Sequence, residues 1–313
     1  MSKVHNFIRK RTPRYIRPPT FSLTFLGTAS GSGPSLGRSC TAASLSLGKR
    51  QWLVDCSEGT LRQHRRATSE KIIGSLNQVE RIFITHLHAD HCMGIVSFMK
   101  ARLPWKPTLA ESHPAESTPI ESEPAELTPF HLYGPKGLRT FVRFLLRATS
   151  TTLGSDYAVH ELLQNGETPT SCAKDERHPN ERVGRNVYPG KDGLWRGIVR
   201  ERTVQVSAGP LTHRVPCVGY VFDGYSMGKL VMLGDTCDPE AIAPIARNAD
   251  ILVHEATAMV PPDPSSMYDL RSDTEAWVRT KAVAKGHSTA RMAGEFAVAI
   301  NAKQLYLNHL SFR

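Results

Sequence analysis

The fold is decided by the stretch Thr85-His86-Leu87-His88-Ala89-Asp90-His91, which has the pattern H-x-H-x-D-H. It lies between an apolar run that predicts a strand and a second run that predicts a helix. On an extended backbone, His86 and His88 point to one side, and Asp90 and His91 fall in the turn that begins the helix. The alternative to metal binding is that these histidines only form hydrogen bonds in a turn and that Asp90 caps the helix. Burying such a cluster without a metal ion is energetically unfavourable. The stretch therefore predicts two neighbouring metal positions.

Other apolar runs of strand character also end at residues able to bind metal. Asp235, His254 and His309 each lie at the end of such a run, as His86 does. Because the carboxyl ends of strands in α/β proteins form the crevice where ligands bind, we expect metal ligands at these ends to converge. We interpret Cys237, close to Asp235, as a small buried apolar residue and not as a metal thiolate.

Length, charge and cysteine content limit the class of protein. A chain of 313 residues fits one large α/β domain. It has no uncharged apolar run of about 18 residues, which argues against a membrane span. The formal charge of +10 favours a polyanionic partner such as nucleic acid, with a solvated basic surface as the alternative. The six cysteines include no Cys-x-x-Cys pair, which predicts free thiols and an intracellular protein.

The chain divides into a basic extension, residues 1–20, and a domain, residues 21–313. No acidic residue precedes Asp55, a pattern typical of mitochondrial targeting segments, although a plain basic extension fits equally well. A mitochondrial and a cytoplasmic or nuclear location therefore both stay open. Within the domain we predict inserts at about 105–130, where proline recurs regularly, and at 164–202, which is rich in charge, proline and glycine.

The H-x-H-x-D-H pattern resembles the signature of the metallo-β-lactamase superfamily. This resemblance implies a four-layer αββα sandwich, with up to two metal ions between its sheets and hydrolytic chemistry. Further motifs resemble the ribonuclease Z family, whose members remove the 3′ trailer of precursor tRNA. They are LeuValAspCysSerGluGlyThr at 53–60, LeuTyrGlyProLysGlyLeu at 132–138, HisGluAlaThr at 254–257, HisSerThr at 287–289 and AsnHisLeuSerPheArg at 308–313.

By this resemblance the chain holds two zinc ions through seven side chains. The implied ligands are His86, His88 and His213 for one ion, Asp90, His91 and His309 for the other, and Asp235 as a bridge between both. Histidine and carboxylate ligands suit zinc, but manganese and iron stay open on the same grounds. For Asp235 the alternative is a turn cap, and for His213 and His309 it is a polar residue that ends a strand.

The resemblance also implies roles in hydrolysis. Asp90 would accept or orient the proton of the attacking water in addition to binding metal. His287 would stabilise the charge of the transition state or protonate the leaving 3′ oxygen, and Glu255 would hold the His287 ring in orientation. His254 and Asp55 would support the site without binding metal.

Two features depart from the ribonuclease Z pattern. The family carries a long arm that grips tRNA, and in this chain only a short connection follows Phe222 at that place. The loop after Gly27 keeps Arg38 but lacks the lysine and asparagine that the family tends to show. Selectivity for tRNA is therefore in question, and the cations of the insert at 164–202 are candidates to replace the phosphate contacts of the arm.

The implied function is that of a zinc-dependent endoribonuclease that removes the 3′ trailer of precursor tRNA. One alternative keeps the metal site but replaces the substrate with a small phosphodiester, such as a cyclic nucleotide. A second alternative is an inactive nucleic-acid-binding scaffold, which would have no need for two metal ions. The sequence leaves open whether the chain forms a homodimer.

Overall fold

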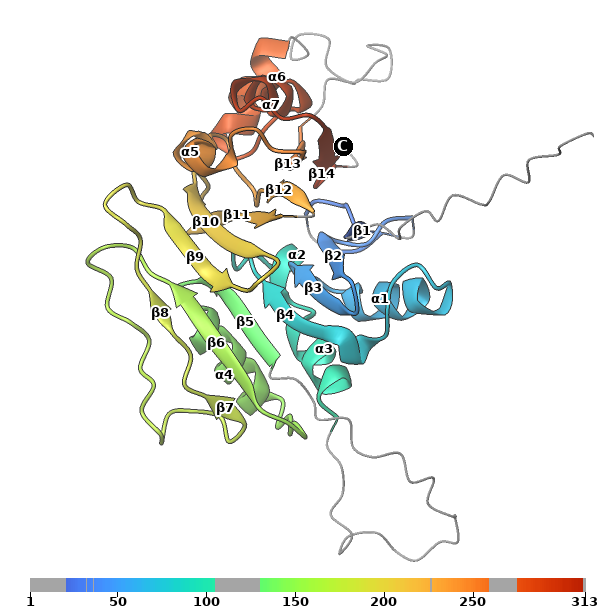
Figure 1. Cartoon of the computed structure of the whole chain (residues 1–313), viewed down its shortest axis with the longest axis vertical. Coiled ribbons are helices and arrows are strands. Elements are labelled where there is room, and N and C mark those ends of the chain that lie inside the picture. Colours follow the sequence, from blue (N-terminus) through green and yellow to red (C-terminus); the bar gives the residue numbers. More distant parts are fainter. Residues whose placement is uncertain are drawn as a thin grey trace, which may run out of the picture.

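Two β-sheets lie face to face in the computed structural model, which describes residues 21–311 apart from 32, 36, 105–129, 226 and 259–274 (Figure 1). The basic extension 1–20 and the proline-rich stretch up to residue 129 lie outside the described residues, so their predicted character stays a prediction. In the described part of the chain, no helix combines the length and the apolar character needed to cross a bilayer.

The first sheet has the strand order β1-β2-β3-β4-β5-β6-β7, and β8 also pairs with β6. Its strands are β1 (Ser22–Gly27), β2 (Ala42–Leu47), β3 (Arg50–Val54), β4 (Val79–Phe83), β5 (Phe130–Pro135), β6 (Tyr157–Leu162), β7 (Glu181–Arg182) and β8 (Asn186–Val187). β2 and β3 form an antiparallel hairpin, and β3 to β6 run parallel. Parallel neighbours need crossover connections, which here carry helices α1 (Thr60–Ser69), α2 (Ala89–Cys92), α3 (Ile95–Arg102) and α4 (Leu138–Ala148) and the short helix η1 (Leu76–Gln78).

The second sheet repeats this plan with the order β14-β13-β12-β11-β10-β9. Its strands are β9 (Trp195–Arg200), β10 (Gln205–Leu211), β11 (Cys217–Gly224), β12 (Gly228–Met232), β13 (Ile251–Glu255) and β14 (Leu305–Asn308). Antiparallel pairs join β9 to β12, and β12, β13 and β14 run parallel. The connections between the parallel strands contain η2 (Glu240–Ile242), α5 (Ala243–Ala246), α6 (Glu275–Ala284) and α7 (Ala290–Ala299).

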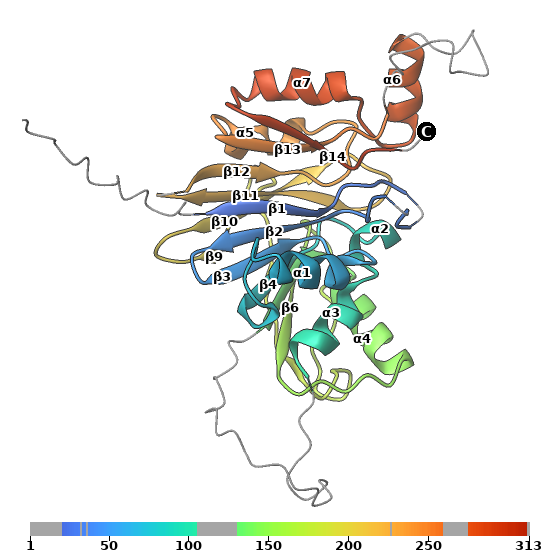
Figure 2. The same ribbon diagram turned by 90° about the vertical axis from the view of Figure 1, so that its right-hand side faces the viewer.

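Each sheet buries one face against helices and the other against the opposite sheet (Figure 2). Along β4, Ile82 packs in the cluster that includes α3 and α4, while the next residue, Phe83, packs between the sheets. Along β11, Val221 faces the α5 and α7 side and Phe222 faces the first sheet. This alternation is the two-residue period of a strand buried on both faces. The predicted four-layer αββα sandwich is thereby observed.

The segment 164–202, predicted as an insert, contributes strands to both sheets. It contains β7 and β8 at the edge of the first sheet and β9 at the edge of the second. Buried ion pairs anchor this edge of the sheet to α4: Arg143 Nε lies 2.6 Å from Glu181, and Arg139 Nη1 lies 3.2 Å from Glu161 of β6. Part of the charge that suggests a solvated loop is therefore buried and paired.

The connection between α2 and α3 is fixed by Gly94. Its N–H donates to the carbonyl of Cys56 at 2.8 Å, and a Cβ at this position would lie 2.0 Å from the carbonyl oxygen of Ser57. A side chain here would force the two backbone segments apart. The helix predicted after the H-x-H-x-D-H stretch therefore forms in two pieces, and the short first piece positions Asp90 and His91.

Candidate metal centre

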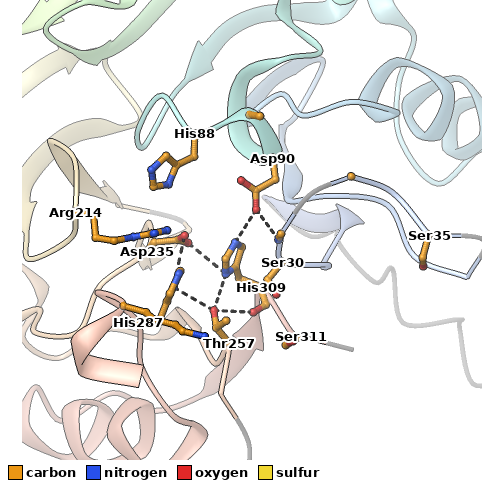
Figure 3. Close-up of a pocket in the computed structure, with 14 residues that line it drawn as sticks. Ser30, Ser35, His88, Asp90, Arg214, Asp235, Thr257, His287, His309 and Ser311 are labelled. Carbon is orange, nitrogen blue, oxygen red and sulfur yellow. Dashed lines mark hydrogen bonds and ion pairs between the residues drawn. The ribbon is translucent and has the colours of Figure 1, made fainter. Parts of the chain in front are cut away.

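The side chains predicted to bind metal come together where strands of both sheets end. Four of them, His88, Asp90, Asp235 and His309, line a cavity of about 540 Å³ (Figure 3). They arrive from separate elements: His86 and His88 follow β4, Asp90 and His91 lie in α2, His213 follows β10, Asp235 follows β12 and His309 follows β14. The carboxyl ends of the parallel strands thus gather ligands from positions far apart in the sequence, as the strand-end pattern predicts.

Three histidines form the first group. His86 Nε2 lies 3.0 Å from His88 Nδ1, and His88 Nδ1 lies 3.2 Å from His213 Nε2. Together with a carboxylate oxygen of Asp235, these ligand atoms all lie within 4.8 Å of one another. The structure thus brings together the set that the sequence assigns to one metal ion.

Asp90, His91 and His309 form the second group, also with ligand atoms within 4.8 Å of one another. His309 Nε2 lies 3.1 Å from Asp90 Oδ2. The same Asp90 oxygen accepts a hydrogen bond from the backbone N–H of Gly31 at 2.7 Å, which ties the N-terminal glycine-rich loop to the site. Both of these contacts use Oδ2, so they leave Oδ1 of Asp90 available.

Asp235 lies between the two groups and turns one oxygen toward each. Its Oδ2 lies 3.6 Å from His86 Nε2 and 3.8 Å from His213 Nε2. Its Oδ1 lies 3.4 Å from His91 Nε2, a ligand atom of the second group. This is the arrangement that a carboxylate bridging two metal ions requires.

The ring of His91 is held from behind by Asp55. His91 Nδ1 donates to Asp55 Oδ2 at 2.8 Å, which leaves Nε2 to face the site. The other oxygen of Asp55 accepts from the backbone N–H of Thr85 at 2.8 Å. Asp55 and His309 have φ of 59° and 53°, in the left-handed region that residues other than glycine seldom adopt.

His213 and His309 are oriented in the same way. His213 Nδ1 donates to the carbonyl of Gly286 at 2.6 Å, and His309 Nδ1 donates to the hydroxyl of Thr257 at 2.7 Å. A hydrogen bond at one ring nitrogen fixes the tautomer and leaves the other nitrogen with a lone pair for a metal ion. Ligand histidines in metal sites are typically held in this way.

The electrostatics of the cluster also fit metal ions. His91 Nε2 and Asp235 Oδ1 are buried, and neither forms a hydrogen bond with a described residue. Burial and the neighbouring histidines hold the pKa of His86 well below its ordinary value, so this ring is neutral. Burial also disfavours a charged His91 ring, yet Asp235 and Asp55 raise the pKa of His91 to about 9. Divalent cations would supply the positive charge that these carboxylates favour and would engage both unpaired atoms.

His287 and Glu255 form an ordered pair beside the ligands. His287 Nδ1 donates to Glu255 Oε1 at 3.0 Å, and the same oxygen accepts from the N–H of Thr236 at 3.0 Å. Oε2 of Glu255 accepts from the hydroxyl of Thr257 at 2.6 Å. Burial alone would raise the pKa of Glu255, but the hydrogen bond with His287 lowers it to about 2, so Glu255 is a carboxylate. The His287 ring lines the cavity in the orientation that this carboxylate dictates.

Four further residues near the site are not among the expected metal ligands. His254 donates through Nδ1 to the carbonyl of Glu255 at 2.7 Å, and its ring packs against Phe296 of α7, so it supports the backbone behind Glu255. Cys237 is outside the ligand groups formed by the described residues, but it is only half-buried and its thiol donates to the carbonyl of Thr212, so the buried position expected of it is not observed. Arg214 and Lys285 line the cavity, although no sequence motif marked either residue.

Comparisons with known proteins give one match to a family model over part of the chain and matches to curated relatives over most of it. Residues 21–107 match the family model described as Anti-Pycsar protein Apyc1. Over a longer span, the chain is 31% identical to Ribonuclease BN from Cronobacter sakazakii, in an alignment that covers 93% of this chain and 89% of that protein. It is also 31% identical to Ribonuclease Z from a Synechococcus species, with 93% and 87% covered.

Solved structures agree with the sequence comparisons. Human tRNase Z, short form, superposes with a TM-score of 0.66 at 29% identity and covers 92% of both chains. The metallo-β-lactamase fold protein YhfI from Bacillus subtilis, at 15% identity, superposes with a TM-score of 0.56 over 94% of this chain and 88% of that chain, which supports the fold alone. The predicted metallo-β-lactamase fold is therefore confirmed, and the chain belongs to the ribonuclease Z family.

Proposed function

We propose that this chain is a metal-dependent endoribonuclease that removes the 3′ trailer of precursor tRNA at a centre for two zinc ions. The observation that carries this proposal is the position of Asp235 between two ligand groups, with one carboxylate oxygen directed at each. The ligand set contains five histidines and two aspartates, which favours zinc while also suiting manganese or iron. The substrate follows from the family, because the human structure named above is of a tRNase Z.

The reaction adds water to phosphorus and breaks the bond to the 3′ oxygen, so that the phosphate stays on the trailer. When bound, two divalent ions would lower the pKa of a water molecule and neutralise charge on the attacked phosphate. Asp90 is fixed by Gly31 and His309, and its second oxygen can accept a hydrogen bond from the attacking water.

His287 is placed to deliver a proton to the leaving 3′ oxygen. Its Nδ1 is engaged by Glu255, so the opposite side of the ring is presented to the cavity. Glu255 also stabilises the positively charged form of this ring and raises its pKa, although burial opposes that charge. Glu255 is thus a positioning residue, and His287 is the group that touches the reacting atoms.

One structural feature favours a smaller substrate as the second candidate. β11 and β12 are joined by a tight hairpin, with Gly224 paired to Gly228, at the place where the resemblance to ribonuclease Z predicts a long arm. A phosphodiesterase for small diesters, such as cyclic nucleotides, would need no such arm. The same metal centre would serve both reactions.

The test compares a precursor tRNA that carries a 3′ trailer with a small chromogenic phosphodiester. We expect the wild-type protein to cut the precursor at the trailer junction, leaving a 3′ hydroxyl on the tRNA. Asp235→Ala should lower this rate on the order of a thousandfold, because both metal positions lose a ligand.

The matched control is Asp223→Ala, which removes an exposed carboxylate outside the cavity and should leave the rate unchanged. A chelator should abolish cutting, and added zinc should restore it. Activity on the small diester alone would contradict the tRNA assignment and favour the second candidate. Equal rates for Asp235→Ala and the wild type would contradict the metal centre itself.

A further inference from the structure

Two cations line the cavity beside the metal centre. Arg214 and Lys285 are the arginine and lysine among the residues that line it, and both are exposed. Figure 3 labels Arg214 among the residues that line the cavity, together with Asp235 and His287. Arg214 thus lines the same cavity as His88 of the first ligand group and His287, the expected proton donor.

The two cations come together through a contact between distant parts of the chain. His213 Nδ1 donates to the carbonyl of Gly286. Arg214, which follows His213, and Lys285, which precedes Gly286, therefore lie on neighbouring segments. Gly286 has φ of 73°, and a Cβ there would lie 2.8 Å from His213 Nδ1 and 3.3 Å from Arg214 Cγ. The stem of Arg214 therefore lies directly against the 285–287 segment.

Neither cation is neutralised by a neighbouring acid. Among the described residues, the side chains of Arg214 and Lys285 form no ion pair, in contrast to nearby exposed cations such as Arg279, which lies 2.8 Å from Glu295. Exposed, unpaired cations at the rim of a site for a polyanion are suited to bind phosphate. Lys285 also follows the C-terminus of α6, where a positive charge stabilises the helix, so a purely structural role is the alternative.

The position of His287 indicates which side of the cleaved bond lies next to Arg214 and Lys285. If His287 protonates the leaving 3′ oxygen, the nucleotide that carries this oxygen lies on the His287 side of the metal centre. The next phosphate on that side is the 5′ phosphate of the same nucleotide. Lys285 lies two residues before His287 in the sequence, Arg214 packs against the intervening Gly286, and these two residues are the arginine and lysine that line the cavity.

We propose that Arg214 and Lys285 bind the phosphate on the 5′ side of the nucleotide whose 3′ oxygen leaves, and so position the mature end of the tRNA for cleavage. This inference rests on the proposed function and deepens it. On this inference, the part of the cavity lined by Arg214 and Lys285 binds the mature tRNA and not the trailer. In a chain with a tight β11–β12 hairpin, such contacts close to the cleavage point would supply part of the affinity for RNA.

The experiment uses a double variant, Arg214→Ala with Lys285→Ala, and a control that removes the same charge. The control is Arg247→Ala with Lys281→Ala, because both of these cations are exposed near helix ends and neither lines the cavity. We expect kcat/KM for precursor tRNA to fall at least tenfold in the first variant, mainly through KM, and to change little in the control. The control should keep the wild-type rate on a small chromogenic diester. The first variant should lose less on this diester, which has no second phosphate, than on precursor tRNA.

A modified precursor tests which phosphate is bound. It carries an uncharged methylphosphonate at the 5′ phosphate of the nucleotide that supplies the leaving oxygen. The kcat/KM of the wild type should fall on this substrate by about the factor by which the double variant falls on the natural precursor. The modification should lower the kcat/KM of the double variant little further. The same pattern should appear in the affinity of chelator-treated protein for labelled mature tRNA, a measurement that does not depend on catalysis.

The possible failures are distinguishable. If the wild type cuts no precursor, the proposed function fails. If the wild type cuts it and the double variant matches its control, the inference about Arg214 and Lys285 is wrong. The assigned direction would be wrong if the double variant still had a lower kcat/KM than the wild type on the 5′ methylphosphonate precursor, by the same factor as on the natural one, but matched the wild type on a precursor modified at the next trailer phosphate.

Discussion

At the scale of single residues, Thr257 connects the two parts of the site. Its hydroxyl donates to Glu255 Oε2 at 2.6 Å and accepts from His309 Nδ1 at 2.7 Å, so one side chain orients both a metal ligand and the support of His287.

Thr257→Val keeps the shape of this side chain and removes its hydroxyl. We expect zinc affinity to fall by about 10- to 100-fold and kcat to fall with it, with little change in melting temperature of the zinc-loaded protein at saturating zinc. Competition with a zinc chelator measures the first effect, Thr257→Ser should restore both, and an unchanged affinity and kcat in the valine variant would refute this role.

At the scale of secondary-structure elements, α1 is attached to β3 through a buried histidine. His64 Nε2 lies 3.1 Å from Gln51 Oε1, and burial lowers the pKa of His64 to about 4. In the unfolded chain His64 takes up a proton near pH 6.5, whereas the folded protein resists protonation until about pH 4. Its contribution to stability is therefore complete above pH 6.5 and is lost as the pH falls toward 4, by up to about 3 kcal/mol. Urea unfolding at pH 7 and pH 5 measures the free energy of unfolding. Between these two pH values, this free energy should fall less for His64→Gln than for the wild type, and an equal fall in both proteins would contradict this account.

Much of the element order could be predicted from the sequence, because apolar runs that end in residues able to bind metal mark the carboxyl ends of β4, β12, β13 and β14, although the residue at the end of β13, His254, supports the site and is not in a ligand group. The segment 164–202 could not be predicted in this way. Its strands are too short for a clear two-residue period, and the ion pair between Arg143 and Glu181 buries charges that ordinarily signal a solvated loop. The approach of Arg214 to Lys285 was equally hidden, since it depends on a contact between residues 213 and 286 that no local pattern encodes.

At the scale of the whole molecule, two sheets of similar plan meet with their parallel strands ending at one cavity. The first sheet supplies His86, His88 and the α2 residues, and the second supplies Asp235 and His309, so neither half holds a complete site. Ion binding should therefore join the two halves and stabilise the fold as well as enable catalysis. The ligand types were predictable from the sequence because their motifs are local, whereas their distances depend on how the two sheets pack.

The central claim is that two metal ions, bridged by Asp235, act together in removing the trailer. Its most direct test is to remove metal from the wild-type protein and add zinc back stepwise while following both bound zinc and trailer removal from precursor tRNA. The account predicts two zinc ions per chain, with full activity reached only when the second ion binds. Full trailer removal with one zinc ion per chain, or with none, would contradict it.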